Sequence, residues 1–561
     1  MLGIASVAVA LAAADTYVVV LALTDMMSGV GVGIQDLNRA TPIISGFLLG
    51  YIAVLPLIGR LSDLISRRQV LLACLGIFIV GSVITAVAVE LPVLVGGRVI
   101  QGVGGGGLVP ATLALVADLW PVQRRGLPLG VVGAVQEAGS VLGPVFGAAI
   151  LSVGGWRLIF WVNAVAGLAL ALGLRLTMRG EVVGRTAGGP PTGVKAPAVA
   201  VVTGALGLGV LVLALVAPRA LVTHLTWGIP FVPFTGTARL ATPVGLVAFA
   251  LLLAWVALSW RGWRPTLRRV DLVGAGCLAI ALGCLVLTFA TASPDREVVG
   301  PSGFALIPLG FVAAAGWGWR QRTAADPLIP PRALSARGVG VALGVSLLTG
   351  AALVAVVVDV PVLARLTYTD DQIQAAFVLV RFLVALPVGA LLGGWCLRRW
   401  PASVPASAGL ALAATGLWTM HSWQPGALDG AAGVGATLTL AAVGLGLGAA
   451  IAPVNAAALA TAQRTDHGVV SGLVVVARMV GMVLGLALLT AVGLRRYYLT
   501  VQDVPPPVAP SVLLDAALVQ VQTVFLGGAI AAGLGALLAL RLARSPSDVR
   551  HPRTSTRTES P

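Results

Sequence analysis

Apolar stretches of about 20 residues recur along the whole chain, and their length restricts the folds that it can adopt. One such stretch spans the roughly 30 Å hydrocarbon core of a bilayer as a single α-helix. Within hydrocarbon every backbone amide must be hydrogen-bonded internally, which a helix achieves and an open loop does not. Because 58% of the 561 residues are hydrophobic and only 10% are charged, no soluble core can absorb these stretches. The sequence therefore predicts an all-α polytopic membrane protein.

Polar segments divide the apolar stretches into groups. Six stretches lie within residues 1–178 and six within 336–545, joined by short turns that suit helical bundles. Between these two bundles, 179–265 begins as a polar linker and continues as an extra transmembrane hairpin, and 266–335 carries two linker transmembrane helices. We therefore expect about 16 spans, followed by a disordered cytoplasmic tail at 546–561.

The extra hairpin is expected to be peripheral. Its two apolar stretches, 198–217 and 242–260, contain no ionisable residue, so nothing in them favours a pore or a proton relay. We predict that they pack beside the two linker helices and do not line a cavity.

Basic residues indicate the orientation of the chain. The sequence has 36 Lys and Arg against 21 Asp and Glu, and most of the basic residues fall in loops that are cytoplasmic when both termini are inside. The positive-inside rule therefore predicts an N-in, C-in protein of the inner (plasma) membrane. The excess charge reports this topology and does not indicate binding to nucleic acid. The stretch 1–14 resembles a secretory signal, but it lacks a basic start, so we interpret it as part of the first span.

The sequence offers little for enzymatic chemistry. Its four cysteines (Cys74, Cys277, Cys284 and Cys396) lie in apolar stretches without metal-ligand spacing, and we interpret them as small packing residues. None of the four histidines lies in the middle of a span, which argues against a His-based proton relay. No nucleophile motif is present. We therefore expect no metal, no cofactor and no enzymatic activity.

Polar residues at membrane depth mark two spans between Arg98 and Gly147. Arg98 and Gln101 lie in the first span, and Glu137 lies in the second, each accompanied by rows of glycine. Charged side chains at that depth must face protein or a water-filled cavity, and glycine rows let helix backbones approach closely. The pattern predicts two interior helices around a polar site. A phosphate-binding loop is the rival interpretation, but no Lys-Ser/Thr follows the glycines.

Two further charged residues, Asp15 and Arg478, lie in mid-span. Asp15, in the first span, is either a proton carrier or a paired structural carboxylate. Glu137 is expected to couple protons or to contact substrate, with a structural pair to Arg98 as the alternative. Arg478 is a candidate counter-charge to either acid, linking the two halves, or else its guanidinium reaches the cytoplasmic boundary. Arg98 is equally compatible with a cavity or a packing role. Elsewhere, Asp359 is expected to pair structurally with Arg381.

Several motifs resemble those of the major facilitator superfamily. The loop from Gly59 through Asp63 to Arg67 and Arg68 resembles the cytoplasmic signature loop of that family, and the segment starting at Arg98 resembles its fourth-helix motif. The fifth span resembles the motif associated with antiporters, carried here by Gly139, Gly143, Pro144 and Gly147. Segments around Asp15, Asp271 and Asp326 are similar to those of 14-helix drug:proton antiporters. Ser66 and Ala148 stand where the family motifs have glycine.

The resemblance implies a fold and a function. It implies the major facilitator fold, with Asp63 capping a neighbouring helix and closing the cytoplasmic side. The stretches DTYVVV, VQEAGSVLGP and HGVVSGLVVVARMVGM resemble a mycobacterial branch that exports triacylglycerides and drugs with a glycolipid-carrying lipoprotein. We therefore expect a monomeric, proton-coupled exporter of lipids, drugs or both, working by alternating access, and possibly an outer-face lipoprotein partner. A non-transporting scaffold that docks such a lipoprotein is the alternative, although charged cavity residues argue against it.

Overall fold

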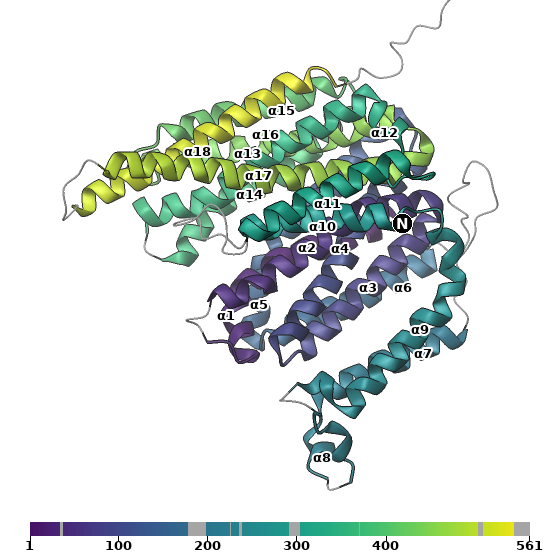
Figure 1. Cartoon of the computed structure of the whole chain (residues 1–561). Coiled ribbons are helices and arrows are strands. Elements are labelled where there is room, and N and C mark those ends of the chain that lie inside the picture. The colour runs from purple at the N-terminus through teal and green to yellow at the C-terminus, as the bar shows by residue number, and fades with distance from the viewer. Residues whose placement is uncertain are drawn as a thin grey trace, which may run out of the picture.

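The computed structural model describes the chain except for residues 34–36, 178–197, 225, 235–237, 291–302, 370, 503–508 and 543–561. Every regular element in the described part is a helix (Figure 1). Thirteen of these helices are long and apolar enough to cross a membrane, or fourteen if α1 (Leu2–Gly29), which bends by 69°, counts as one span. The prediction of an all-α membrane protein is confirmed. The expected tail and the start of the linker lie outside the described residues.

The expected number of spans stays a prediction. It also includes α11 (Gly303–Thr323) and α15 (Ser403–His421), which are not among the helices that meet the length and hydropathy criteria. Both nevertheless run alongside apolar neighbours. Helix α11 packs on α10 (Leu272–Ala290), and α15 packs against α16 (Gly430–Thr461) and α18 (Pro510–Ala539). Their glycine, tryptophan and hydroxyl content lowers their hydropathy without preventing helical packing.

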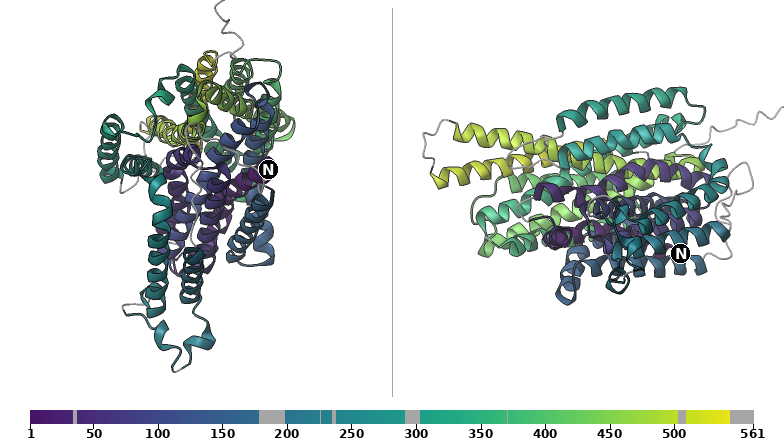
Figure 2. Two further views of the ribbon diagram at one scale, coloured as in Figure 1. Left: turned by 90° about the vertical axis from the view of Figure 1, so that its right-hand side faces the viewer. Right: turned by 60° about the horizontal axis from the view of Figure 1, so that its bottom comes forward.

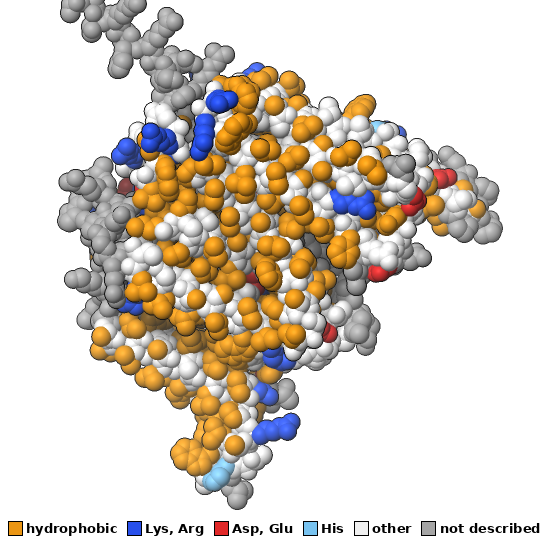
Figure 3. All heavy atoms as spheres, turned by 180° about the vertical axis from the view of Figure 1, so that it is seen from behind, with side chains coloured by type: hydrophobic (Ala, Val, Ile, Leu, Met, Phe, Trp, Pro, Cys, Tyr) orange, Lys and Arg blue, Asp and Glu red, His pale blue; other side chains and the backbone are white. Residues whose placement is uncertain are grey.

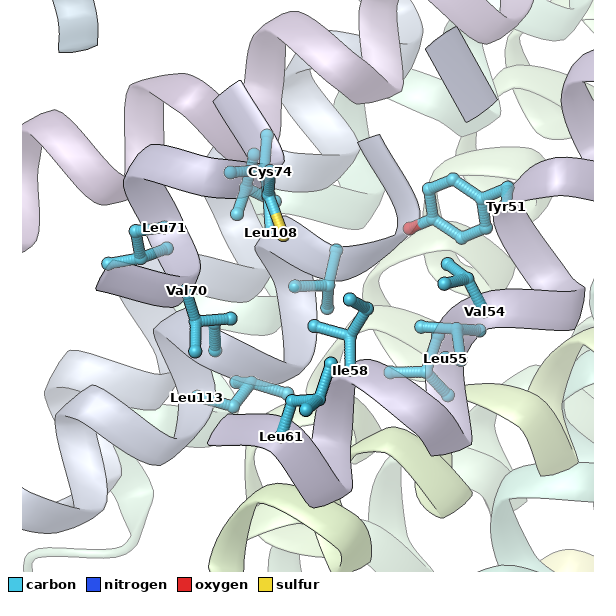
Figure 4. Close-up of a cluster of buried hydrophobic side chains, with 14 of the residues drawn as sticks. Tyr51, Val54, Leu55, Ile58, Leu61, Val70, Leu71, Cys74, Leu108 and Leu113 are labelled. Carbon is cyan, nitrogen blue, oxygen red and sulfur yellow. The ribbon is translucent and has the colours of Figure 1, made fainter. Parts of the chain in front are cut away.

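The first six helices pack together around α4. These helices are α1, α2 (Leu37–Leu64), α3 (Arg67–Val87), α4 (Leu91–Leu119), α5 (Gly126–Val153) and α6 (Arg157–Thr177). The most apolar window of α4 is 83% buried, because its glycines let α2 and α3 approach its backbone. A Cβ at Gly102 would lie 2.1 Å from the Phe47 carbonyl oxygen, and one at Gly104 would lie 2.3 Å from the Phe78 amide nitrogen. Side chains of α2, α3 and α4 complete a buried cluster (Figure 4).

The last six long helices form a second group, and one of them repeats the glycine spacing of α5. The group comprises α13 (Arg337–Thr367), α14 (Gln372–Cys396), α15, α16 (Gly430–Thr461), α17 (His467–Val501) and α18 (Pro510–Ala539). The spacing of four glycines in α5 recurs in α17. The glycines of α5 are Gly126, Gly130, Gly139 and Gly143, and those of α17 are Gly468, Gly472, Gly481 and Gly485.

The repeated glycines make equivalent contacts in the two groups. Gly139 lies against α1, where an added Cβ would be 2.4 Å from the Ala10 oxygen. Gly481 lies against α13, where an added Cβ would be 1.9 Å from the Leu347 oxygen. The first two glycines of each helix instead contact the other group. Gly126 and Gly130 of α5 pack on α14, and Gly468 and Gly472 of α17 pack on α2. Both of these contacts lie at the end of the molecule that carries the α2–α3 turn, which we call the inner end.

The two additional hairpins occupy different places. The linker hairpin α10–α11 packs through α10 on α2 and also contacts α17. The extra hairpin, α7 (Ala198–Val216) and α9 (Pro243–Leu267), packs mainly on itself and contacts the first group through α3 (Figures 1 and 2). The expectation that it lies beside the linker helices is therefore wrong.

Apolar packing and one polar contact explain the position of the extra hairpin. Leu215 of α7 joins a buried cluster that includes Ile84 and Val87 of α3. The backbone N–H of Arg239 donates to Glu90 Oε1 at 2.7 Å, which fastens the loop of the hairpin to the α3–α4 turn. Away from these contacts the helices expose apolar side chains, as does much of the face in Figure 3, where hydrophobic atoms dominate the surface. Such a surface suits contact with lipid chains.

Candidate functional site

A small cavity lies between the two groups of helices. Its volume is about 30 Å³, enough for roughly one water molecule. Five helices from both groups line it with Val109, Leu113, Leu129, Val132, Gly133, Gln136, Ser346, Thr349, Ala450, Ile451, Val454, Asn455, Val474, Val475 and Arg478. Most of this lining is apolar, and its polar groups come from α5, α13, α16 and α17. Few hydrogen-bonding groups face the cavity, and at this volume any ligand larger than water requires the two groups of helices to move apart.

An ion pair joins the two groups beside this cavity. Arg478 Nη1 of α17 donates to Glu137 Oε1 of α5 at 3.0 Å, and both side chains are nearly buried, with 11% and 13% of their surface exposed. The cavity-lining residues of both helices lie on the inner-end side of this pair. Of the two acids proposed for Arg478, the structure therefore brings Glu137 to it.

A second charged cluster lies sealed within the first group. Arg98 Nη1 of α4 donates to Asp15 Oδ2 of α1, and also to Gln101 Oε1 at 2.6 Å. Gln101 Nε2 donates to Asp15 Oδ1 at 3.0 Å, and Asn163 Nδ2 of α6 donates to the same oxygen. Ser82 of α3 accepts a further hydrogen bond from Gln101 at 2.9 Å. Four helices thus contribute to the network around Asp15, and all five residues are buried.

This cluster selects between alternatives that the sequence left open. Asp15 is a paired carboxylate, and Arg98 pairs with Asp15 instead of Glu137. None of the five side chains is among those that line the cavity. The Arg98 guanidinium also lies 4.5 Å from the centre of the Phe47 ring, which further encloses it. Asn163 was not among the residues predicted from the sequence, although a single amide within an apolar span indicates a buried partner.

The residues of the signature loop meet at the inner end. Asp63 accepts hydrogen bonds from the backbone N–H groups of Gly468 (2.7 Å) and Val469 (3.0 Å), which begin α17 in the other group. Arg67 donates to Asp63 Oδ1 at 3.1 Å and to Asp118 Oδ2 at 3.0 Å. The carboxylate of Asp63 thus caps the positive end of a helix from the opposite group, the geometry that the family resemblance implies.

The other two residues of this loop have separate contacts. Gly59 packs directly against the start of α17, where an added Cβ would be 2.6 Å from the Gly468 oxygen. Arg68 donates to the Arg175 carbonyl oxygen at 3.2 Å, which ties α3 to α6 within the first group. Ser66, which replaces a glycine of the family motif, accepts a hydrogen bond from the Gln69 N–H at 3.4 Å and so caps α3.

The glycines of the fifth-helix motif face α1 and not the cavity. Added Cβ atoms at Gly139 and Gly143 would each lie 2.4 Å from a carbonyl oxygen of α1, and one at Gly147 would lie 2.6 Å from a Val18 methyl group. Pro144 lies inside α5 between these contacts. The motif therefore fixes α5 against the helix that carries Asp15.

Comparison with known proteins identifies the family. The family model described as Major Facilitator Superfamily matches residues 5–342. This chain belongs to the major facilitator superfamily. It is therefore a multi-pass membrane transporter. The fold expected from its motifs is confirmed.

Relatives of this facilitator are named as lipid transporters. A triacylglyceride transporter of Mycolicibacterium hassiacum is 37% identical to it, with 90% of this chain and 81% of the relative covered. A triacylglyceride transporter of Mycobacterium tuberculosis is 36% identical, with 88% and 82% covered. A probable triacylglyceride transporter of Mycobacterium leprae is 33% identical, with 98% and 97% covered. The likeness to the mycobacterial branch is thus confirmed.

Solved structures support the fold alone. The human organic anion transporter matches with a TM-score of 0.56 at 14% identity, covering 96% of this chain and 98% of that one. The proton:xylose symporter XylE matches with a TM-score of 0.55 at 12% identity, covering 96% and 94%.

One expected pair is absent from this facilitator. Arg381 of α14 donates to Thr437 Oγ1 of α16 at 3.0 Å. Asp359 of α13 is buried, and within the described part of the chain it forms no ion pair. The expectation of an Asp359–Arg381 pair is therefore wrong, because the arginine turns towards the neighbouring α16.

Arginines outside the spans stabilise helix ends at the inner end. Arg125 donates to the carbonyl oxygens of Ala117 (2.6 Å) and Trp120 (2.9 Å) at the end of α4, and its burial, together with the nearby Arg464, lowers the pKa of Arg125. Arg332 donates to Asp466 at 2.9 Å just before α17, and this contact raises the pKa of Arg332. Both arginines remain charged near neutral pH, so these contacts persist there.

Proposed function

We propose that this facilitator exports hydrophobic or amphiphilic compounds, foremost lipids, across the inner membrane in exchange for protons. The Glu137–Arg478 ion pair beside an apolar cavity carries this proposal. The pair joins the two groups of helices through a carboxylate that can take up a proton. The lipid class is suggested by relatives that are named triacylglyceride transporters. Drugs of similar polarity suit the same lining.

Alternating access would proceed by rocking of residues 1–178 against residues 336–545. The backbone N–H groups of Gly468 and Val469 donate to Asp63, and the Ser471 hydroxyl donates to the Pro110 oxygen. These hydrogen bonds join the two groups towards the inner end. We assign these contacts to a conformation whose inner end is closed. With the N-in, C-in orientation that the basic residues favour, this closed end faces the cytoplasm.

The inner gate in this proposal consists of Gly59, Asp63, Arg67 and Arg68. Asp63 holds the start of α17, Arg67 holds Asp63, and Gly59 allows the two backbones to touch. Opening of the inner end would break the two bonds between Asp63 and α17 while keeping the Arg67–Asp63 contact within the first group.

Glu137 is proposed to couple this motion to protons. A proton on Glu137 removes the negative charge that attracts Arg478, and the pair then no longer favours the arrangement in which α5 and α17 are close. Leaving Arg478 unpaired in this nearly buried site costs several kcal/mol of free energy, since an unpaired buried charge costs about 3–5 kcal/mol. That energy is sufficient to shift a two-state equilibrium.

Asp15 is proposed as a second titratable site. Its neutralisation would leave Arg98 without a counter-charge inside the first group, and would therefore strain the packing of α1 on α4. Because Gly143 holds α5 against α1 next to Asp15, a shift of α1 would reach α5, the helix that carries Glu137.

Transport in proteoliposomes tests the proposal. We expect Glu137→Gln to abolish the dependence of lipid efflux on a proton gradient between about pH 6 and 8, because the amide cannot exchange a proton. Asp25→Asn, which alters an exposed carboxylate of α1, is the matched control and should behave as wild type. Wild-type, gradient-dependent efflux by Glu137→Gln would refute the coupling role.

The same assay addresses the scaffold alternative. A scaffold that only docks an outer-face lipoprotein would not move lipid in proteoliposomes that contain this chain alone. Efflux without the lipoprotein therefore favours a transporter, and an increase when a lipoprotein is added would identify it as an acceptor. Size measurement of the reconstituted protein tests the expected monomer.

A further inference from the structure

We propose that a groove between the end of α9 and the start of α10 binds the phosphate headgroup of an anionic phospholipid. The groove has a volume of about 350 Å³ and is lined by Trp260, Arg264, Leu267, Arg268 and Leu272. It lies outside the central cavity and shares no residue with it. The proposal does not depend on the transported substrate.

The arrangement of the lining residues suits a headgroup. Trp260, Arg264 and Arg268 follow one another at intervals of four, which places them on one face of α9. Arg264 and Arg268 are both exposed, and no hydrogen bond or ion pair with either side chain occurs within the described residues. Two guanidinium groups on one helix face present several N–H donors to a single phosphate.

The local charge favours an anionic lipid over a zwitterionic one. Arg269, which is also exposed, adds a third positive charge next to the groove. The acid nearest in sequence, Asp271, is already engaged, because Arg320 Nε of α11 donates to its Oδ1 at 3.0 Å. The nearest acid in sequence is thus already paired with another arginine and leaves the charge of Arg264 and Arg268 uncompensated by it. Basic pockets between membrane helices are typical binding sites for anionic headgroups.

The depth of the groove matches the headgroup layer. The apolar part of α9 ends at Trp260, and that of α10 begins at Leu272, so both lining helices cross the membrane boundary here. At about 1.5 Å per residue, Arg264 lies roughly 6 Å beyond the hydrocarbon, and each headgroup layer is about 5–7 Å thick. Trp260, 48% exposed, provides the aromatic ring that is enriched at such interfaces.

The position of the groove indicates a role in joining the two hairpins. In Figure 1, α9 leads from the extra hairpin towards the linker hairpin α10–α11. A headgroup held by Arg264 and Arg268 beside Leu272 would bridge the last turns of α9 and the first turn of α10. The bound lipid would therefore fix the extra hairpin relative to the helices that contact both groups.

Native mass spectrometry of the purified protein provides the test, with phosphatidylglycerol as probe and phosphatidylcholine for comparison. We expect tight binding of phosphatidylglycerol to the wild type. The double variant R264Q/R268Q should bind roughly 30-fold more weakly, at about 1 kcal/mol for each arginine near the membrane surface. The control R398Q/R399Q removes two exposed arginines that follow α14 and should retain wild-type affinity. Melting temperatures in phosphatidylcholine establish that each variant is folded.

The contrary outcomes are distinct. Equal binding of phosphatidylglycerol by R264Q/R268Q and wild type would overturn the proposal, and so would an equal loss in R398Q/R399Q. Binding of phosphatidylcholine as tight as that of phosphatidylglycerol would overturn the charge argument. Displacement of the lipid by millimolar inorganic phosphate would assign the groove to a free anion and overturn a lipid occupant.

Discussion

Replacement of Arg478 by alanine tests whether the ion pair between α5 and α17 controls the conformation. The substitution leaves the Glu137 carboxylate nearly buried without its 3.0 Å partner. Loss of one partner of a buried pair costs about 3–5 kcal/mol, and we take about 3 kcal/mol because slightly more than a tenth of each side chain is exposed. At about 1.4 kcal/mol for each factor of ten, the inner-closed state should become roughly 150-fold less favoured.

Hydrogen exchange and transport report the two consequences of Arg478→Ala. In the closed state the N–H groups of Gly468 and Val469 donate hydrogen bonds to Asp63. In the variant these N–H groups should exchange faster, and gradient-driven efflux should be lost. Arg478→Lys keeps the charge but loses the planar fork, so it should retain part of the activity. Arg381→Ala is the control, because that arginine bonds to Thr437 within the second group.

Two results would refute this reasoning. Wild-type exchange and wild-type efflux in Arg478→Ala would show that the pair does not bias the conformation. Inactivity of the alanine and lysine variants with unchanged exchange would point to a geometric role for the guanidinium at the cavity.

Three other perturbations follow from the described contacts. Asp15→Asn should abolish proton-driven efflux and lower stability by roughly 3 kcal/mol, because Arg98 loses its counter-charge; thermal melting in detergent measures the second effect, and an unchanged melting temperature would contradict it. Gly468→Ala should open the inner end and slow transport, since its Cβ would lie 2.0 Å from Ser62 Oγ, whereas Gly340→Ala, with open space around it, should be neutral. Labelling of a cysteine introduced in place of a cavity residue, by thiol reagents added from the inner end, distinguishes the two variants. Asp63→Asn should speed exchange at the start of α17 roughly fivefold, through weaker capping worth about 1 kcal/mol. Wild-type exchange would argue against a gate held by this residue.

The sequence was sufficient for the helices and for the motifs that have fixed spacing. Hydrophobic length identifies each span without knowledge of its neighbours, and the loop from Gly59 to Arg68 has its residues close together in the chain. The partners of buried charges were not accessible in the same way. Asp15 and Arg98 are 83 positions apart, and the helix faces that bring them together depend on how four helices pack.

Alternatives of similar chemistry also limited the sequence analysis. Arg478 had two candidate acids, and only the packing of α17 on the first group selects Glu137. Arg381 had Asp359 as an apparent partner, but a neutral threonine on α16 satisfies it instead. The extra hairpin carries no charged residue in its apolar stretches that could indicate its neighbours, so its docking on α3 depends on apolar shape and on Glu90 in a turn.

The glycine contacts at the inner end have a consequence for entropy. Gly59 meets Gly468, and Gly130 meets Gly394, with backbone against backbone. A contact between long side chains would restrict their rotamers each time it formed, at about 1–2 kcal/mol for each large side chain, whereas glycine has no rotamer freedom to lose. Closure through these glycines therefore carries little conformational entropy penalty, and the balance between closed and open states is left to the few charged groups that join the two halves.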